Sequence, residues 1–203
     1  MNKHQKFGIV LTVIGIFLFA VIPLSDYIIN RISKQVVEDL SIENIRQNEL
    51  ATADFDFDQV QEINASSFKR LVNFSEEAIG VISIPEVSME LPIFKGLEND
   101  KLMVGAGTMK ESQIMGKGNY ALAGHNWRDK KTLFSPLHRV KKDMHIYMKD
   151  LQKEYEYRID KIIMVDPNRL DVIEDTKTAT LTLVTCNHDG TERLIVQASL
   201  VNS

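Results

Sequence analysis

The sequence predicts a mainly β domain that closes into a barrel and is preceded by one transmembrane helix. Seven short segments rich in β-branched and aliphatic residues lie between residues 78 and 201, separated by Pro, Gly and Asp/Asn breaks. Helical periodicity is weak between them, and many short strands of this kind favour a closed β barrel. Near the N-terminus, residues 7–24 form an uncharged apolar run.

The apolar run predicts a membrane anchor. Its eighteen residues follow Lys3 and Lys6 and reach the minimum length of a spanning helix, which extends to residue 29 if Asp26 lies among the headgroups. A cleaved signal peptide is the alternative, but its apolar core is normally shorter and ends in a small-x-small site, which residues 19–23 match poorly. We therefore expect residues 1–6 in the cytoplasm, a single anchor at 7–29 and the rest of the chain outside the cell.

Residues 30–77 are expected to form an acidic linker and N-terminal extension. Between residues 38 and 62 the chain carries eight acids and one base, Arg46, which gives a local charge of −7. Anionic lipid headgroups would repel such a segment, so we interpret it as a solvated stalk with some helix between residues 32 and 50.

The remaining residues, 78–203, are enough for one domain with an adequate core. The expected strands are 78–84, 89–94, 119–124, 144–149, 154–165, 180–186 and 193–201. Short helical turns are expected at 100–104, at 133–140 and within 168–175.

Charge and cysteine content exclude several function classes. The formal net charge is −4 and no basic stripe is interleaved with aromatic residues, which argues against nucleic acid as a partner. The chain has one cysteine, Cys186, so an internal disulfide and a zinc site built on several cysteines are both excluded. The sulfur is therefore a buried spare thiol, a modification site or a reactive thiol.

The strand before this cysteine is predicted to form a hairpin. Asp189-Gly190 follows it and is a strong signal for a two-residue turn. That turn places Cys186 directly opposite Arg193, with their Cβ atoms roughly 4.5–5.5 Å apart on the face away from the core. The expected core-facing residues are Leu181, Leu183, Leu194, Val196, Ala198 and Leu200.

A histidine ends another predicted strand. Alternation places His125 on the face of Ala121 and Ala123, whose small side chains leave room for a groove, while Tyr120 and Leu122 face the other way. His188 is the rival candidate for proton transfer, because it is two residues from Cys186, but a position in the hairpin turn would leave it mobile and poorly oriented. The other histidines are assigned to the membrane-proximal end, for His4, or to the surface, for His138 and His145.

Three features of the sequence occur in a specific order: the motif Leu122-Ala123-Gly124-His125, the motif Thr182-Leu183-Val184-Thr185-Cys186 and the following Arg193. Together they resemble class A sortases, the membrane-anchored cysteine transpeptidases of Gram-positive bacteria. The resemblance implies a barrel of about eight strands, with Cys186 as nucleophile and His125 as acid/base. It also implies that Arg193 acts in oxyanion stabilisation or substrate positioning and that a backbone N–H near Thr185 supports the oxyanion. These roles are chemically reasonable, because nearby positive charge favours the thiolate.

The resemblance also implies the substrates. A secreted protein with an LPXTG-like sorting signal would be cleaved between Thr and Gly, and its thioacyl form would pass to an amino group of a lipid-linked peptidoglycan precursor, which anchors it to the cell wall. The membrane anchor would hold the enzyme where both substrates are confined. Candidate residues of an apolar substrate groove, for each of which plain core packing is the alternative, are Ala123, Leu170, Val172, Ile173 and Val184.

No metal or other cofactor is expected. Some relatives use calcium held by a cluster of acids before the histidine strand, but here Lys110, Glu111 and Lys117 supply one carboxylate among two lysines, with Glu174 and Asp175 in the later loop. Two other classes remain as alternatives: a membrane-tethered binding module with an inert thiol, and a papain-like hydrolase. The second is disfavoured because its cysteine begins a helix, whereas Cys186 ends a strand.

Overall fold

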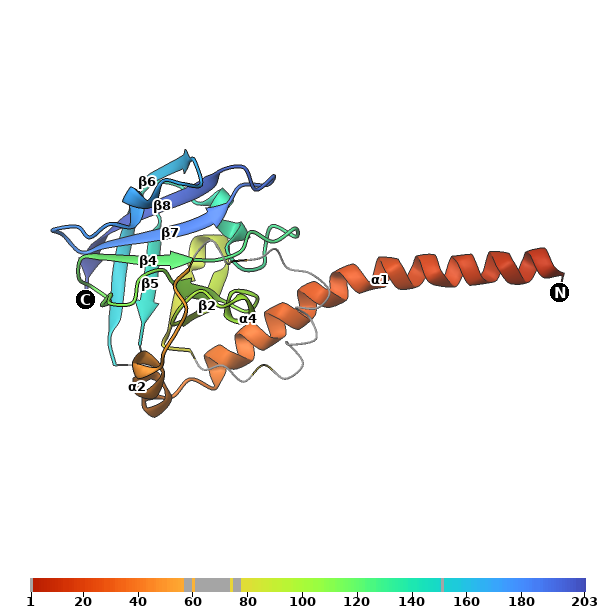
Figure 1. The fold of residues 1–203 in the computed structure, drawn as a ribbon, viewed down its shortest axis with the longest axis horizontal. Coiled ribbons are helices and arrows are strands. Elements are labelled where there is room, and N and C mark those ends of the chain that lie inside the picture. The colour runs from red at the N-terminus through yellow and green to blue at the C-terminus, as the bar shows by residue number, and fades with distance from the viewer. Residues whose placement is uncertain (1, 57–59, 61–73, 75–77, 151) are drawn as a thin grey trace.

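The computed structural model describes residues 2–56, 60, 74, 78–150 and 152–203, and these residues form a closed β barrel with a long N-terminal helix (Figure 1). Eight strands in this part of the chain close in the order β1-β2-β3-β4-β7-β8-β6-β5. The strands are β1 Gly80–Ile84, β2 Met89–Phe94, β3 Ala106–Thr108, β4 Asn119–Ala123, β5 His145–Lys149, β6 Glu154–Val165, β7 Thr180–Cys186 and β8 Arg193–Asn202. The helices are α1 Lys3–Glu38, α2 Ile42–Leu50 and α4 Asn99–Leu102, with 3-10 turns η2 Pro85–Val87, η3 Ser135–Arg139 and η4 Leu170–Ile173.

The predicted barrel, its seven strands and its three helical turns are confirmed, and one strand was missed. The missed strand, β3, has three residues with glycine at its centre, so it is too short to show alternation. It nevertheless completes the barrel, because it pairs in parallel with β2 and antiparallel with β4.

Two parallel strands set the position of the site. β4 pairs in parallel with β7, with Asn119 opposite Thr180 and Ala123 opposite Val184. Parallel strands end at the same edge of a sheet, so the residues that follow β4 and those that end β7 come together there.

The two faces of these strands contribute to different clusters, as alternation predicted. Tyr120 and Leu122 join the main core together with Leu181, Leu183, Leu194, Val196 and Ala198. Ala121 and Ala123 belong instead to a smaller cluster with Val184 and Val172. The expected core face of the hairpin is therefore confirmed.

The hairpin register is also confirmed, although its turn differs from the prediction. Cys186 pairs with Arg193, and the Asn187 N–H donates to the Glu192 carbonyl at 3.0 Å. The tight turn, however, is closed by the Gly190 N–H on the Asn187 carbonyl. It is centred on His188 and Asp189 rather than on Asp189-Gly190. The loop between the paired residues Asn187 and Glu192 has four residues and is still centred between Asp189 and Gly190. Cys186 therefore remains opposite Arg193.

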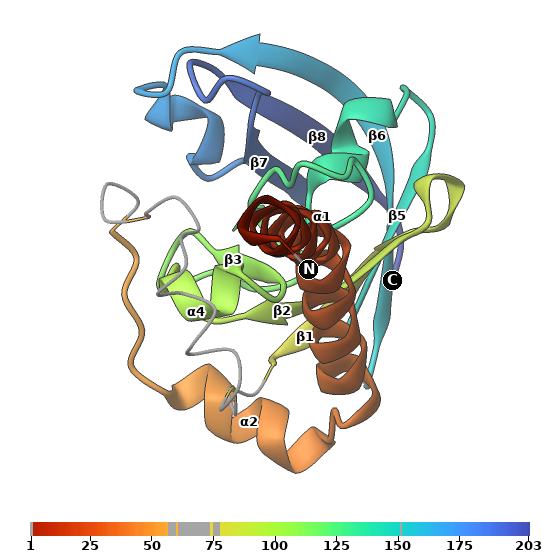
Figure 2. The same ribbon diagram turned by 90° about the vertical axis from the view of Figure 1, so that its right-hand side faces the viewer.

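The N-terminal helices lie partly against the barrel. The first half of α1 projects away from it, while the second half runs alongside β2 (Figure 1 and Figure 2) and buries Ser25, Ile29 and Ser33. In the residues that the structure describes, no helix combines the length and apolar character needed to cross a bilayer.

Part of the expected solvated linker also packs on the barrel. Ile45 of α2 is buried, Lys95 donates from Nζ to the Glu49 carbonyl at 2.6 Å, and the Leu97 N–H donates to the Asp54 carbonyl at 2.7 Å. The acidic segment is therefore attached at several points as far as Asp54.

Candidate active site

Cys186 and His125 share one cavity at the edge where β4 and β7 end. Its volume is about 360 Å³. The β4 side contributes His125 and the three residues after it, and the β7 side contributes Cys186 and the hairpin loop. The parallel pairing of the two strands thus brings together a thiol and an imidazole that are far apart in the sequence.

His125 is half-buried and is held by its backbone. The Gly124 N–H donates to the Val184 carbonyl at 3.1 Å, and the Phe134 N–H donates to the His125 carbonyl at 3.0 Å. Glycine is required at position 124, because a Cβ there would lie 2.7 Å from the Phe134 ring. Nε2 of His125 is buried and has no hydrogen-bond partner among the described residues. Burial lowers the pKa of His125 to about 4, so the ring is neutral at pH 7.

Two contacts that the sequence did not reveal hold the backbone around Cys186. Thr185 is buried and donates from Oγ1 to the Gly124 carbonyl at 2.7 Å, which ties β7 directly to the residue before His125. His138 places Nε2 3.2 Å from the Cys186 carbonyl. The sequence suggested a surface position for His138; in the structure it is half-buried, and burial lowers its pKa.

His188, the rival candidate base, is stacked on His138. The ring centroids are 4.8 Å apart and the planes lie at 18°. The ring thus has a packing partner, contrary to the free position expected for a turn residue, although His188 remains exposed and lines the same cavity as Cys186.

Arg193 is opposite Cys186 in the hairpin, as predicted. Its Nη1 donates to the Gly190 carbonyl at 3.0 Å, within the β7–β8 loop. The side chain lines a second, apolar cavity of about 20 Å³ with Val172, Ile173 and Val184. Arg193 is therefore next to Cys186 through its strand pairing and next to part of the predicted groove through this cavity.

The predicted groove residues are largely brought together. Ala123, Val172, Val184 and Ile173 belong to one cluster, and Ala123 and Val184 also line a cavity of about 30 Å³ that includes His125 and Cys186. The side chain of Leu170 lies outside the described residues. Val60 of the N-terminal segment packs on the same cluster and lines the same small cavity, a contact for which the sequence gave no signal.

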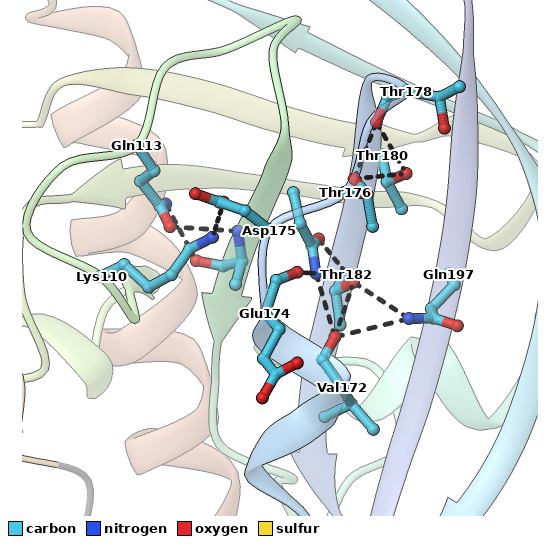
Figure 3. A network of polar contacts seen from close by, with 12 residues as sticks. Lys110, Gln113, Val172, Glu174, Asp175, Thr176, Thr178, Thr180, Thr182 and Gln197 are labelled. Carbon is cyan, nitrogen blue, oxygen red and sulfur yellow. Dashed lines mark hydrogen bonds and ion pairs between the residues drawn. The ribbon is translucent and has the colours of Figure 1, made fainter.

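A buried polar network fixes η4 against β4 and β7. Asn119 donates from Nδ2 to the carbonyls of Val172 and Glu174, each at 3.0 Å, and accepts from Thr182 Oγ1 at 2.8 Å. Figure 3 shows Thr182 and Gln197 converging on the Val172 carbonyl. The network therefore holds the apolar side chains of η4 over the end of the groove.

An ion pair joins the loop before β4 to the loop before β7. Lys110 places Nζ 2.6 Å from Asp175 Oδ1 (Figure 3), and Lys110 together with other neighbours lowers the pKa of that carboxyl. The part of the chain that the structure describes contains no group of three or more His, Cys, Asp or Glu side chains arranged to hold a metal.

Comparisons with known proteins agree on one family. Residues 82–201 match the model of the sortase domain. Sortase A of Listeria monocytogenes is 37% identical over 97% of this chain and 90% of its own length, and sortase A of Streptococcus agalactiae is 44% identical over 86% of this chain and 71% of its own length. The crystal structure of the Listeria monocytogenes sortase A superposes with a TM-score of 0.61 at 40% identity, covering 63% of this chain and 89% of that one.

Proposed function

Because the chain belongs to the sortase family, and is therefore a sortase-type transpeptidase, we propose that it cleaves LPXTG-like sorting signals between Thr and Gly and joins the released acyl group to an amine of a peptidoglycan precursor. The observation that supports the proposal most directly is the shared cavity of Cys186 and His125 at the ends of two parallel strands. The site residues and both substrates are part of the proposal.

The proposed first half-reaction is thiol attack on the Thr carbonyl. Since burial keeps His125 neutral, its ring can take the proton of the Cys186 thiol as the sulfur attacks. The developing oxyanion would be stabilised by the Arg193 guanidinium and a backbone N–H near Thr185. The imidazolium then protonates the Gly nitrogen, the C–N bond breaks, and the peptide amine leaves a thioester on Cys186.

The second half-reaction uses the same groups in reverse. An amine of the peptidoglycan precursor attacks the thioester carbonyl, and His125 takes the proton that the amine loses. The C–S bond breaks, the sulfur recovers a proton, and a new amide is formed. Water can replace the amine, in which case the product is a free carboxylate.

The apolar cluster beside Cys186 suits the Leu-Pro part of the signal. Val172, Ile173 and Val184 line a cavity with Arg193, Ala123 belongs to the same cluster from the β4 side, and η4 is held there by the Asn119 network. Leu170 stays part of the proposed groove.

We further propose the domain organisation expected from the sequence. Residues 1–6 are cytoplasmic, and the anchor expected at 7–29 crosses the membrane through its uncharged run 7–24, because Asp26 and Ile29 already contact the barrel. Residues 30–77 link the anchor to the catalytic domain at 78–203, and that domain faces outward. The support is the uncharged run 7–24 and the way the first half of α1 projects from the barrel (Figure 1).

Activity is proposed to be independent of calcium, because the Lys110 ammonium already neutralises Asp175 between the two loops. Adding calcium to a chelated enzyme should change the rate of peptide cleavage by less than twofold. A strong activation would refute the proposal.

The deciding experiment is to incubate the detergent-solubilised full chain with an LPXTG peptide and candidate amines and to measure product masses. Amide products that require both peptide and amine support the proposal, and Cys186→Ala should give none. Binding of the peptide without cleavage by the unmodified chain would instead indicate a binding module.

A further inference from the structure

The loop that follows His125 is fastened to two successive turns of α1. Trp127 donates from Nε1 to Asp26 Oδ1 at 2.7 Å, and Arg128 places Nη2 3.3 Å from the same oxygen. Arg128 also donates to Ser25 Oγ. One turn further on, Asn30 donates from Nδ2 to Thr132 Oγ1 at 2.8 Å, on the return side of the loop.

The loop is braced by internal hydrogen bonds, so a contact at Trp127 is transmitted to the base of the loop. The base is closed by the Asn126–Leu133 bridge and by the Phe134 N–H on the His125 carbonyl. Within the loop, Asp129 accepts from the Thr132 N–H at 2.8 Å and from Thr132 Oγ1 at 2.7 Å. Ser135 donates from Oγ to the Trp127 carbonyl at 2.7 Å. Residues 126–134 therefore behave as one braced loop with His125 at its start.

Burial makes the α1 contact significant. Only 19% of the Asp26 side chain is exposed, and on the same face of α1 Ser25, Ile29 and Ser33 are buried at a spacing of four residues. A hydrogen bond to a carboxylate that water reaches poorly is stronger than one between neutral, solvated groups. This part of α1 therefore packs directly against the loop.

We propose that Asp26 is a positioning residue of the active site, which holds the braced loop through Trp127 and thereby fixes the imidazole of His125 relative to Cys186. This rests on the proposed function in one respect, the assignment of His125 as acid/base. No hydrogen bond within the described residues orients Nε2 of that ring, so its placement depends on the backbone that carries it.

The proposal predicts a change at the ring when the contact is lost. A freed loop admits water beside His125, and the pKa of the ring moves from about 4 toward its ordinary value of about 6.5. The ionisable groups that line the same cavity are Cys186, His188 and Asp189 of the hairpin and Arg128 of the loop itself.

The test uses the full chain in detergent with Asp26→Ala, Asp26→Asn and Trp127→Phe, and Lys34→Ala as the matched control. Lys34 lies on the exposed side of α1 and pairs only with Glu38 in the described contacts. The readouts are kcat and KM for the sorting-signal peptide and an NMR titration of the histidine Cε1–H signals, with His125 assigned by its absence in His125→Gln.

We expect Asp26→Ala to lower kcat about tenfold with KM changed less than twofold, since small misplacements of a catalytic group act on kcat. The His125 titration should move up by at least one pH unit. Asp26→Asn keeps an oxygen that can accept the hydrogen bond from the Trp127 indole, so kcat and the His125 titration should both stay close to those of the unmodified chain. Trp127→Phe leaves the Asp26–Arg128 pair in place and should show the same changes in kcat and in the His125 titration as Asp26→Ala. It tests the proposal if Asp26→Ala does not fold.

A His125 titration and kcat in Asp26→Ala and Trp127→Phe equal to those of Lys34→Ala would overturn the proposal. So would a loss of kcat that only follows the fraction of folded protein. Because the titration needs no substrate, it decides the role of Asp26 even if the full chain cleaves no sorting-signal peptide, an outcome that would count against the proposed function alone.

Discussion

At the scale of single residues, the two histidines near Cys186 differ in what holds them. His125 continues β4 and has its carbonyl tied to Phe134, whereas His188 is exposed in a turn and stacks on His138. A general base must keep a defined orientation toward its proton. We therefore keep His125 as the proposed base, the choice that the turn position of His188 had suggested.

The first prediction compares these two histidines. His125→Ala should lower kcat/KM for the sorting-signal peptide by about 100- to 10,000-fold, the usual contribution of a general acid/base. His188→Ala should cost less than fivefold, because it removes only a stacking partner. Steady-state kinetics on the two purified variants checks this, with circular dichroism to confirm folding. A larger loss in His188→Ala would mean that the base has been assigned to the wrong ring.

The second prediction concerns pH and the buried ring of His125. Its pKa is about 4 in the folded chain and about 6.5 when unfolded. Between these values the unfolded chain binds a proton that the folded chain does not, so the free energy of unfolding decreases as pH falls from about 6.5 to 4 and is unaffected above that window. The full difference is about 3 kcal/mol.

The measurement is urea denaturation of the wild type and His125→Gln at several pH values from 7.5 to 4. Glutamine does not titrate, so the variant should lose less stability than the wild type on acidification. Parallel curves for the two proteins would show that His125 is accessible to protons in the folded state.

At the scale of elements, the sequence predicted what depends on local pattern and missed what depends on distant contacts. Strands β4, β7 and β8 alternate clearly, and their predicted faces and the predicted register of β7 with β8 were correct. β3 has too few residues to show a pattern. The contact of His138 with the Cys186 carbonyl joins residues 48 positions apart, and no local signal indicates such a contact.

The third prediction addresses the element beside the groove. Asn119→Ala removes two hydrogen bonds to the η4 region and leaves the Thr182 hydroxyl without its acceptor on Asn119. Loss of buried partners should cost about 2–4 kcal/mol of stability and raise KM for the peptide several-fold as η4 loosens. Thermal denaturation and kinetics check both effects.

Asn168→Ala is the matched control, since Asn168 is exposed and bonds only to Asp166 in the described contacts. It should change stability by less than about 0.5 kcal/mol. Equal melting temperatures for the two variants would contradict the role given to the Asn119 network.

At the scale of the whole molecule, the sequence indicated an anchor and a barrel but not how the segment between them packs. The buried face of α1 contains Ser25 and Ser33, whose small polar side chains give no hydrophobic signal, beside the buried Ile29 and the partly buried Ile32 and Val36. The acidic charge of residues 38–62 suggested a solvated stalk. Acidic residues, however, identify only the exposed face of such a segment, and Ile45 on the opposite face is buried.

The fourth prediction separates the two halves of α1. A chain that begins at residue 25 keeps Asp26, Ile29 and α2, so it should be released from membranes yet melt like the full domain. A chain that begins at residue 57 loses the buried Ile29 and Ile45 side chains as well as the contacts of Asp54. Burial of each isoleucine contributes about 1.5–3 kcal/mol, which corresponds to a melting temperature lower by about 6–20 °C.

Differential scanning calorimetry and the peptide cleavage assay compare the two shortened chains. The shorter one should also show a lower kcat, because the His125 loop has lost α1. If it instead melts and turns over like the longer chain, the second half of α1 is only a spacer, and the anchor and the catalytic barrel are independent. If it is less stable and slower, α1 belongs to the catalytic domain from about residue 25, and the boundary expected at residue 78 lies too far along the chain.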